Sequence, residues 1–187
     1  IANDTDSISE QMHQAREAFA RSSRKTRYIA YFQAFTNTYA PVEHLKELYD
    51  TAIDHEDVIG LMIGTRPDCV PDDVLDLVAT YRHDRFELWL ELGMQTMHDR
   101  SLKYLFRGHT HSQTRDAIFR SAQRGIPLCV HVILGIPGET WENMMETARE
   151  ISSLPVQGLK LHHLHAIRGT RLGEYFIQDQ FTPITFS

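Results

Sequence analysis

The stretch FELWLELGMQT, residues 86–96, reads as a strand with two unlike faces. Three leucines alternate along it with Trp89, Glu91 and Gly93. Successive side chains of a strand point to opposite faces of the sheet, so the leucines share one face. A carboxylate is costly in a solid apolar core, which indicates that the face with Glu91 looks into a cavity. The stretch therefore predicts a barrel or half-barrel that encloses a ligand.

This stretch is one of five strand-like segments that alternate with helical ones. Strands joined by helices form a parallel sheet with right-handed crossovers, so the fold class is α/β. In VHVILG, His131 takes the place that Glu91 has in the earlier strand, alternating with apolar residues. The expected strands are 27–35, 58–65, 86–94, 127–136 and 158–167, and the expected helices are 8–25, 41–53, 71–83, 114–125 and 140–154.

Polar or glycine-rich residues follow each expected strand. In parallel sheets of this kind the chemistry lies at the carboxyl ends of the strands. We therefore expect a functional site to be built from these segments. They are QAFTNT (33–38), GTRPD (64–68), ELGMQT (91–96), GIPGET (135–140) and HHLHAIRGT (162–170).

Each segment also has a structural interpretation. Thr36 and Asn37 are ordinary turn and cap residues, and Thr140 can cap the helix that follows it. Arg66 can be a surface residue in a turn. A buried Glu91 needs a partner, which is either Arg66 in an internal salt bridge or a hydroxyl of a ligand.

Composition narrows the functional classes. The 187 residues carry a formal charge of −6, with a pI near 6 and no run of basic residues, so this chain has no basic footprint for a polyanion. No apolar run is long enough to cross a membrane. The two cysteines, Cys69 and Cys129, are sixty residues apart, which favours a reducing cytoplasm over a disulfide framework.

Four motifs, taken in order, resemble those of the radical S-adenosylmethionine (SAM) enzymes. The resemblance is to the bacterial iron-sulfur oxidoreductases near the Elongator-acetyltransferase and coproporphyrinogen-oxidase types, and it covers residues 28–170. It implies a partial (β/α)6 TIM-like barrel, here five parallel strands without the first, in a single domain 1–187. Residues 1–27 would hold an N-terminal helix, 28–170 the barrel and 171–187 an exit segment. The motifs are YFQAFTNTYAP (31–41), GTRPDC (64–69), WLELGMQ (89–95) and GIPGE (135–139).

The resemblance assigns cofactor contacts motif by motif. The second-strand motif of the family holds the methionyl amine of SAM, the fourth-strand motif its ribose and carboxylate, and the fifth-strand motif its adenine. This chain departs from the pattern, since the second-strand motif lacks glycines and a carboxylate, Glu139 is displaced by one place, and His131 stands where glycine is common. The implied SAM-binding residues are Gln33, Thr36 and Asn37, then Arg66, then Glu91, Gln95 and Thr96, and finally Ile133, Gly135 and Gly138.

The cluster motif of the family, CxxxCxxC, is absent from this chain, and two cysteines cannot supply three thiolates. We expect the [4Fe-4S] ligands outside this chain, before Ile1, and no metal ligands within it. The resemblance implies that the full-length protein cleaves SAM reductively to a 5′-deoxyadenosyl radical, with flavodoxin or ferredoxin as electron donor. This chain by itself would be inactive. Several relatives modify tRNA, so RNA is the substrate class to test first.

Two other classes of function stay open on the residues alone. An α/β barrel could be a metal-dependent hydrolase that uses His131, His163 and His165, or an aldolase that forms a Schiff base on Lys160. His162 and His163 point to opposite faces of one strand, so at most two of the three histidines in HHLH can converge. A non-catalytic RNA-binding module is the third class.

Overall fold

A five-stranded parallel sheet organises the computed structural model, which describes residues 7–20, 27–33 and 35–184. Its strands follow the chain order from one edge to the other. They are β1 (Tyr28–Phe32), β2 (Val58–Thr65), β3 (Glu87–Gln95), β4 (Leu128–Leu134) and β5 (Gly158–His163). The helices are α1 (Ile8–Ala20), α2 (Val42–Ile53), the 3₁₀ turn η1 (Pro67–Cys69), α3 (Asp72–Thr80), α4 (Asp99–Tyr104), α5 (His111–Gln123), α6 (Trp141–Ser152) and α7 (Arg171–Ile177).

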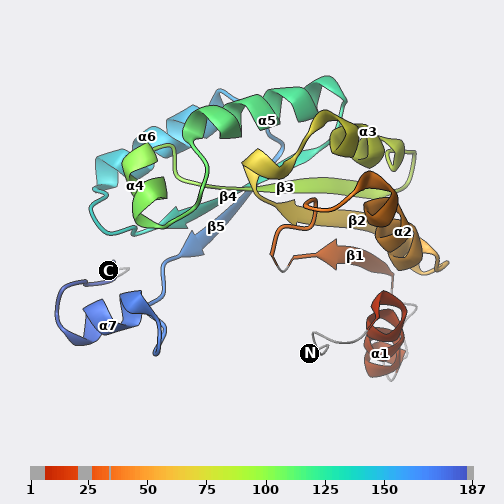
Figure 1. Cartoon of the computed structure of the whole chain (residues 1–187), viewed down its shortest axis with the longest axis horizontal. Coiled ribbons are helices and arrows are strands. Elements are labelled where there is room, and N and C mark those ends of the chain that lie inside the picture. Colours follow the sequence, from red (N-terminus) through yellow and green to blue (C-terminus); the bar gives the residue numbers. More distant parts are fainter. Residues whose placement is uncertain (1–6, 21–26, 34, 185–187) are drawn as a thin grey trace.

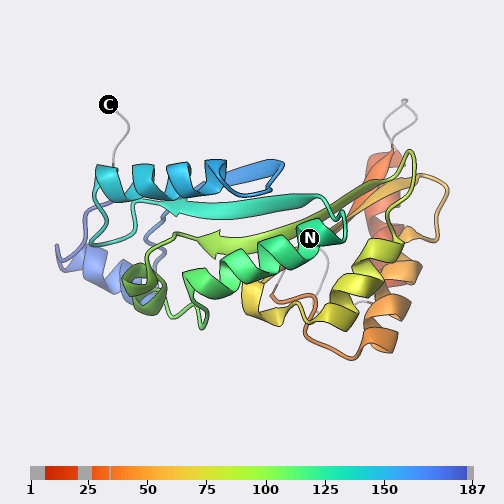
Figure 2. The same ribbon diagram turned by 90° about the horizontal axis from the view of Figure 1, so that it is seen from above.

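The sheet is curled and its helices lie mainly on one side. Figure 1 shows α2 to α6 over that face, with α1 and α7 at the two ends of the opposite face. The covering helices form one layer from α2 at one edge to α6 at the other (Figure 2). Leu88, Leu90 and Leu92 of β3 are 3%, 0% and 0% exposed and belong to the core under this layer. The expected α/β half-barrel of parallel strands is therefore confirmed.

The register of the sheet places the polar residues of different strands on one face. Glu91 of β3 pairs with Cys129 of β4, and His131 of β4 pairs with Lys160 of β5. Paired residues of neighbouring strands project to the same side of a sheet. The concave face therefore collects these four side chains.

The five expected strands are all present, although β1, β4 and β5 are shorter than expected. The helix expected at 8–25 is described as far as Ala20, and residues 21–26 lie outside the described part. Thr140 caps α6 in a capping box, as one interpretation of GIPGET had it. The expectations missed α4, and they began α5 three residues late because Thr110 caps it at His111. The boundaries of a single domain stay a prediction.

No helix in the described ranges combines the length and the apolar character needed to cross a membrane.

Candidate functional site

A cavity of about 320 Å³ opens at the carboxyl ends of the strands. Its floor comes from the concave face of β1 to β5, and its rim comes from the segments that follow β1, β2 and α4. The lining is predominantly polar, in contrast to the apolar core on the other face. The residues that line it are Tyr31, Gln33, Phe35, Thr36, Gly64, Thr65, Arg66, Glu91, Gly93, Gln95, Arg107, His131 and His162.

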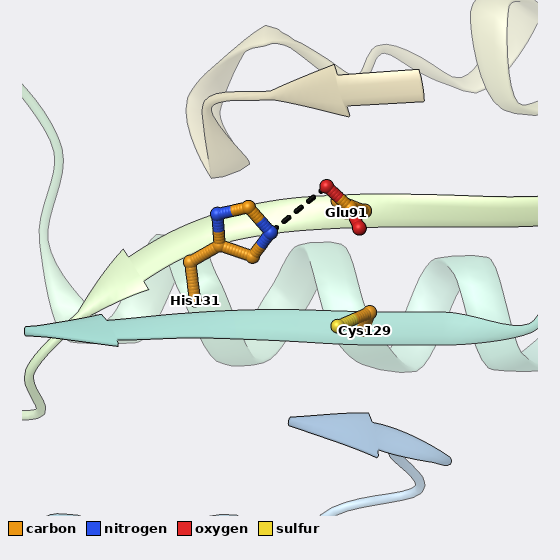
Figure 3. A group of neighbouring side chains, drawn as sticks. All are labelled: Glu91, Cys129 and His131. Atoms are coloured by element: carbon orange, nitrogen blue, oxygen red, sulfur yellow. Dashed lines mark hydrogen bonds and ion pairs between the residues drawn. The ribbon is translucent and has the colours of Figure 1, made fainter. Parts of the chain in front are cut away.

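Glu91 is the most deeply buried charge on the cavity floor, with a side chain only 2% exposed. Its Oε2 accepts hydrogen bonds from the phenol of Tyr31 and from Nε2 of His131, the latter at 2.9 Å. The ammonium of Lys160 lies 3.5 Å from the same oxygen and donates to the Tyr31 hydroxyl at 2.8 Å. Figure 3 shows the imidazole of His131 reaching from β4 toward Glu91 on β3. The carboxylate is therefore both neutralised and hydrogen-bonded.

Tyr31 reaches Glu91 across an intervening strand. β2 lies between β1 and β3, and Gly64 is the residue of β2 that pairs with Glu91. Gly64 has no side chain to stand beside Glu91 on the concave face. The Tyr31 phenol meets the carboxylate on this face.

Burial and charge set the protonation states of this group. Burial lowers the pKa of His131, and the nearby ammonium of Lys160 lowers it further, against the opposing effect of Glu91. Burial by itself would lower the pKa of Lys160, but the hydrogen bond to Tyr31 and the charge of Glu91 outweigh it and raise that pKa. Burial raises the pKa of Tyr31 and of Cys129. The group therefore holds a lysine cation, a neutral histidine, a phenol and a thiol around one carboxylate.

Glu91, Cys129 and His131 bring three potential metal-ligand atoms within 4.8 Å of one another. However, Glu91 already has the Lys160 ammonium as its counter-charge, and a metal ion there would have to displace this cation. Burial also favours the protonated thiol of Cys129, whereas a metal needs the thiolate. The donor set thus suits an ion pair with hydrogen bonds better than a metal centre.

The two alternative barrel chemistries find no support in this geometry. His163 lies on the other side of β5 from Lys160, where its Nε2 contacts the carbonyl of Ile184 at 3.0 Å and its ring packs on His165. The three histidines of the hydrolase hypothesis therefore do not converge, since His131 faces the cavity. A Schiff-base lysine needs a lowered pKa to be nucleophilic, whereas that of Lys160 is raised.

Arg107 is a cavity residue that the sequence analysis missed. Its guanidinium lies over Gly93, where an added Cβ would be 2.8 Å from Nη2. Its Nε is buried and has no hydrogen-bond partner in the described part of the chain. Burial lowers the pKa of Arg107, and the neighbouring Arg66 lowers it further. Asp68 acts in the opposite direction. A half-buried guanidinium that lines a cavity and has a buried Nε without a partner is suited to bind an anion, above all a carboxylate or phosphate.

Arg66 lines the same cavity, but it does not pair with Glu91 as one hypothesis had it. It forms a bidentate ion pair with Asp68, at 2.9 and 2.5 Å. Asp68 is two residues away along the chain, so Arg66 forms this ion pair within its own loop. The salt-bridge interpretation of Glu91 is therefore correct in kind and wrong in partner, because Lys160 takes that role.

The predicted SAM-binding residues divide into two groups. Gln33, Thr36, Arg66, Glu91 and Gln95 line the cavity together. The other five do not line it. Asn37 uses its amide to donate to the carbonyls of Phe32 and Gly64, and Thr96 donates to Glu139 at 2.7 Å. The remaining three are Ile133 near the end of β4 and, in the turn after it, Gly135 and Gly138, both with positive φ.

The fold and the site together define the structural class of this chain. The chain is an α/β half-barrel whose parallel strands carry a polar cavity at their carboxyl ends. Residues 4–151 match the Radical SAM superfamily, and the chain belongs to this family. Membership implies SAM and a [4Fe-4S] cluster as cofactors.

Curated relatives match most of this chain. The chain is 42% identical over 177 residues to the uncharacterized protein MJ0486 of Methanocaldococcus jannaschii, covering 95% of this chain and 55% of that protein. It is 43% identical over 190 residues to YtqA of Bacillus subtilis, covering 97% of this chain and 59% of that protein. The chain thus spans little more than half the length of these relatives. A tRNA uridine(34) acetyltransferase of Dehalococcoides mccartyi is 28% identical over 145 residues, covering 76% of this chain and 30% of that protein.

Solved structures share the fold. The archaeal Elp3 of Methanocaldococcus infernus, with an N-terminal deletion, has a TM-score of 0.75 at 21% identity and covers 95% of this chain and 46% of its own. Coproporphyrinogen III oxidase (HemN) of Escherichia coli, described as a radical SAM enzyme, has a TM-score of 0.62 at 16% identity and covers 97% of this chain and 42% of its own.

Proposed function

We propose that the full-length protein is a radical SAM enzyme that binds SAM in the 320 Å³ cavity and cleaves it reductively. One observation carries the placement of SAM, namely the buried Nε of Arg107, which has no hydrogen-bond partner in the described residues. The methionyl end of SAM has a carboxylate, which is the anion that this guanidinium lacks. A bidentate pair of this kind fixes orientation as well as affinity.

Other residues of the lining are proposed to hold the remaining polar groups of SAM. The side-chain amide of Gln95 lies beside Arg107 over Gly93, so both can reach one carboxylate. Gln33 and Thr36 stand at the rim after β1 and would take the methionyl ammonium or the ribose. The Tyr31–Glu91–Lys160 group forms the floor, where it presents fixed polar atoms and excludes water.

The adenine contacts and two further residues remain part of the proposal. Ile133, Gly135 and Gly138 are proposed to approach the adenine, since two glycines with positive φ let the backbone come close to a flat ring. Asn37 and Thr96 are proposed to act indirectly, by holding the rim and the end of β3 in place.

The cluster and SAM together supply one-electron chemistry when both are bound, and the protein positions and shields the reactants. This chain does not fit the cluster itself, because its two cysteines lie on different elements, in η1 and on β4. We therefore propose that the cluster ligands belong to a part of the protein outside these 187 residues. A flavodoxin or ferredoxin is the proposed electron donor. The two unpaired thiols support a reducing cytoplasmic location.

RNA is the proposed substrate class. The support is that a relative of this chain is named a tRNA uridine(34) acetyltransferase. The chain has a net charge of −6, so we expect its contacts to RNA to be few and local.

The test uses the full-length protein, prepared anaerobically and reconstituted with iron and sulfide. SAM affinity is measured by calorimetry, and 5′-deoxyadenosine is measured after reduction with dithionite. We expect Arg107→Ala to weaken SAM binding by about tenfold to a hundredfold, as for the loss of a charged hydrogen-bonded pair. Arg149→Ala is the matched control, because Arg149 is exposed on α6 and pairs with Glu142.

The two readouts separate the parts of the proposal. Wild-type affinity in Arg107→Ala would contradict the placement of the carboxylate. A reconstituted wild-type protein that binds a cluster but forms no 5′-deoxyadenosine would contradict the reaction itself.

A further inference from the structure

A second cavity, of about 310 Å³, lies between the end of α4 and α7. Aromatic rings dominate its walls, and we call it the aromatic cleft. Phe106 is 79% exposed and Tyr104 is 41% exposed, so both rings face solvent at its edge. Small-molecule pockets begin at roughly 300 Å³, so the cleft suits one ring system. It is lined by Tyr104, Leu105, Phe106, Thr170, Arg171, Leu172 and Tyr175.

Arg171 supplies a positive charge between the rings. Its guanidinium carbon lies 5.9 Å from the centroid of Phe106 and 5.4 Å from that of Tyr175, and its Nε donates to the Tyr175 hydroxyl at 2.7 Å. These contacts hold the guanidinium at the cleft. Arg171 forms no ion pair with Glu174 or with any other acid in the described residues, so its charge stays available to an anion.

Two more cations flank the lining residues along the chain. Lys103 precedes Tyr104 directly, and Arg168 precedes Thr170 by two places. Neither makes an ion pair within the described ranges, whereas Arg120 and Arg124 on α5 and after it are paired with acids. In a chain of net charge −6, Arg171 therefore lines the aromatic cleft, and two further cations without ion pairs in the described ranges stand next to its lining residues along the chain.

The aromatic cleft adjoins the cofactor cavity through consecutive residues. Phe106 lines the cleft and Arg107 lines the cavity. Phe106 has φ of 53°, a left-handed conformation that is unfavourable for a bulky non-glycine residue. This backbone turns the two side chains to different sites. Figure 1 shows α4 and α7 near the carboxyl ends of β3 to β5. The lining of the cavity comes from this end of the strands.

We propose that the aromatic cleft binds an unpaired base of a single-stranded nucleic acid, with Arg171, Lys103 and Arg168 on its phosphates. Stacking on exposed aromatic rings, combined with a few cations on the backbone, is how proteins hold single strands without a broad basic surface. The inference rests on the proposed RNA substrate and gives it a subsite beside the cofactor. A base in the cleft would bring a neighbouring nucleotide of the same strand to the mouth of the cavity.

The experiment measures binding of a short, unstructured, fluorescein-labelled RNA to the full-length protein by fluorescence anisotropy. We expect Phe106→Ala and Tyr175→Leu each to weaken binding by about tenfold or more, the effect of losing a stacked base. Phe119→Ala is the matched control, because Phe119 on α5 is 41% exposed and also stacks under an arginine, Arg115 at 5.6 Å. We expect Arg171→Gln to reduce the slope of affinity against salt by about one.

Cross-linking of a 4-thiouridine RNA to the unmodified protein provides a readout that does not depend on the folding of variants. The expected adducts are on the segment 104–106 or on α7. A matching DNA that binds equally would support a site that reads base and phosphate only, and weaker DNA binding would support contact with the 2′-hydroxyl.

Three results would overturn the inference. They are unchanged RNA affinity in both aromatic variants, equal losses in Phe119→Ala, and adducts confined to other elements. Binding of an aromatic peptide in the cleft in place of RNA would have the same meaning. A protein that forms 5′-deoxyadenosine but binds no RNA would leave the proposed SAM chemistry standing and remove only this subsite.

Discussion

Two charged side chains that line the same cavity differ in how they are compensated. Glu91 has three donors around one carboxylate oxygen, from Tyr31, His131 and Lys160. Arg107 has a buried Nε with no partner in the described residues. A charge that has its partners within the protein contributes to the structure, whereas a charge without a partner favours binding of a ligand of opposite charge. This contrast indicates that Glu91 supports the floor of the cavity and that Arg107 is the residue suited to bind an anion.

His131 predicts how stability depends on pH. Burial holds its pKa in the folded protein below the ordinary value of about 6.5, although Glu91 opposes this and Lys160 and His162 reinforce it. As pH falls through 6.5, the unfolded chain therefore takes up the proton before the folded protein does. The contribution of His131 to the free energy of unfolding is therefore retained above about pH 6.5 and is lost progressively as the pH falls below it.

Urea unfolding at about pH 7.5 and about pH 5.5 measures this effect. We expect His131→Gln to lose less stability over that interval than the wild type. His44→Gln, at an exposed position on α2, should keep the wild-type loss. Equal losses in all three proteins would contradict the assignment to His131.

A substitution at Gly93 should affect SAM binding more than folding stability. A Cβ there would be 2.8 Å from Nη2 of Arg107 and 2.8 Å from Nε2 of Gln95, both at the ends of flexible side chains. We expect Gly93→Ala to change the free energy of unfolding by less than about 1 kcal/mol while it weakens SAM binding, because the guanidinium must move. Calorimetry with SAM and urea unfolding give the two values.

Gly60→Ala is the contrasting variant on β2. Its Cβ would be 2.5 Å from the carbonyl oxygen of Glu87, a backbone atom that cannot rotate away. We expect it to destabilise the protein by about 1–3 kcal/mol. Normal SAM affinity in Gly93→Ala would show that SAM binding does not depend on the position of the Arg107 guanidinium over Gly93.

At the scale of elements, Asn37 holds the segment between β1 and α2 in its conformation. Its amide nitrogen donates to the carbonyls of Phe32 at 3.0 Å and Gly64 at 2.9 Å, which ties the ends of β1 and β2 together. Both amide protons are therefore in use. Asn37 differs in this respect from Gln33 and Thr36, which line the cavity.

We expect Asn37→Ala to lower the free energy of unfolding by about 1–3 kcal/mol, because the carbonyls of Phe32 and Gly64 both lose the amide donor. The Gly64 carbonyl keeps the longer bond from the backbone N–H of Asn37, at 3.4 Å. Asn37→Asp keeps the acceptor oxygen but lacks both donors, so it should lose a similar amount. Chemical denaturation of both variants is the measurement. Unchanged stability together with lost SAM affinity would instead establish Asn37 as a direct ligand.

The elements also show what sequence patterns can and cannot predict. The alternation in β3 depends on the neighbouring residues alone, and it predicted both the buried leucines and the cavity-facing Glu91. The partners of Glu91 were out of reach, because Tyr31 and Lys160 are brought to it by the register of the sheet from distant strands. Arg107 gave no signal either, since it stands in an irregular segment after a short helix that no periodicity marks.

For the whole molecule, the cavity implies a compromise between stability and ligand binding. The buried Nε of Arg107 without a hydrogen-bond partner destabilises the ligand-free protein, because the desolvation of this atom is not offset. Arg107→Met keeps much of the side-chain volume and removes the charge. We therefore expect Arg107→Met to raise the free energy of unfolding of the ligand-free protein by about 1–2 kcal/mol, in the direction seen when buried charges are replaced by apolar residues.

The same variant should respond differently to SAM. Saturating ligand stabilises a folded protein by mass action, by about 2.7 kcal/mol at a hundredfold excess over Kd. We expect thermal denaturation under anaerobic conditions to show a SAM-dependent rise in Tm for the wild type and little or none for Arg107→Met. Arg107→Lys should lie between them, since it keeps the charge without the bidentate geometry. A less stable Arg107→Met that still gains the full increment from SAM would mean that the guanidinium supports the fold and does not bind the carboxylate.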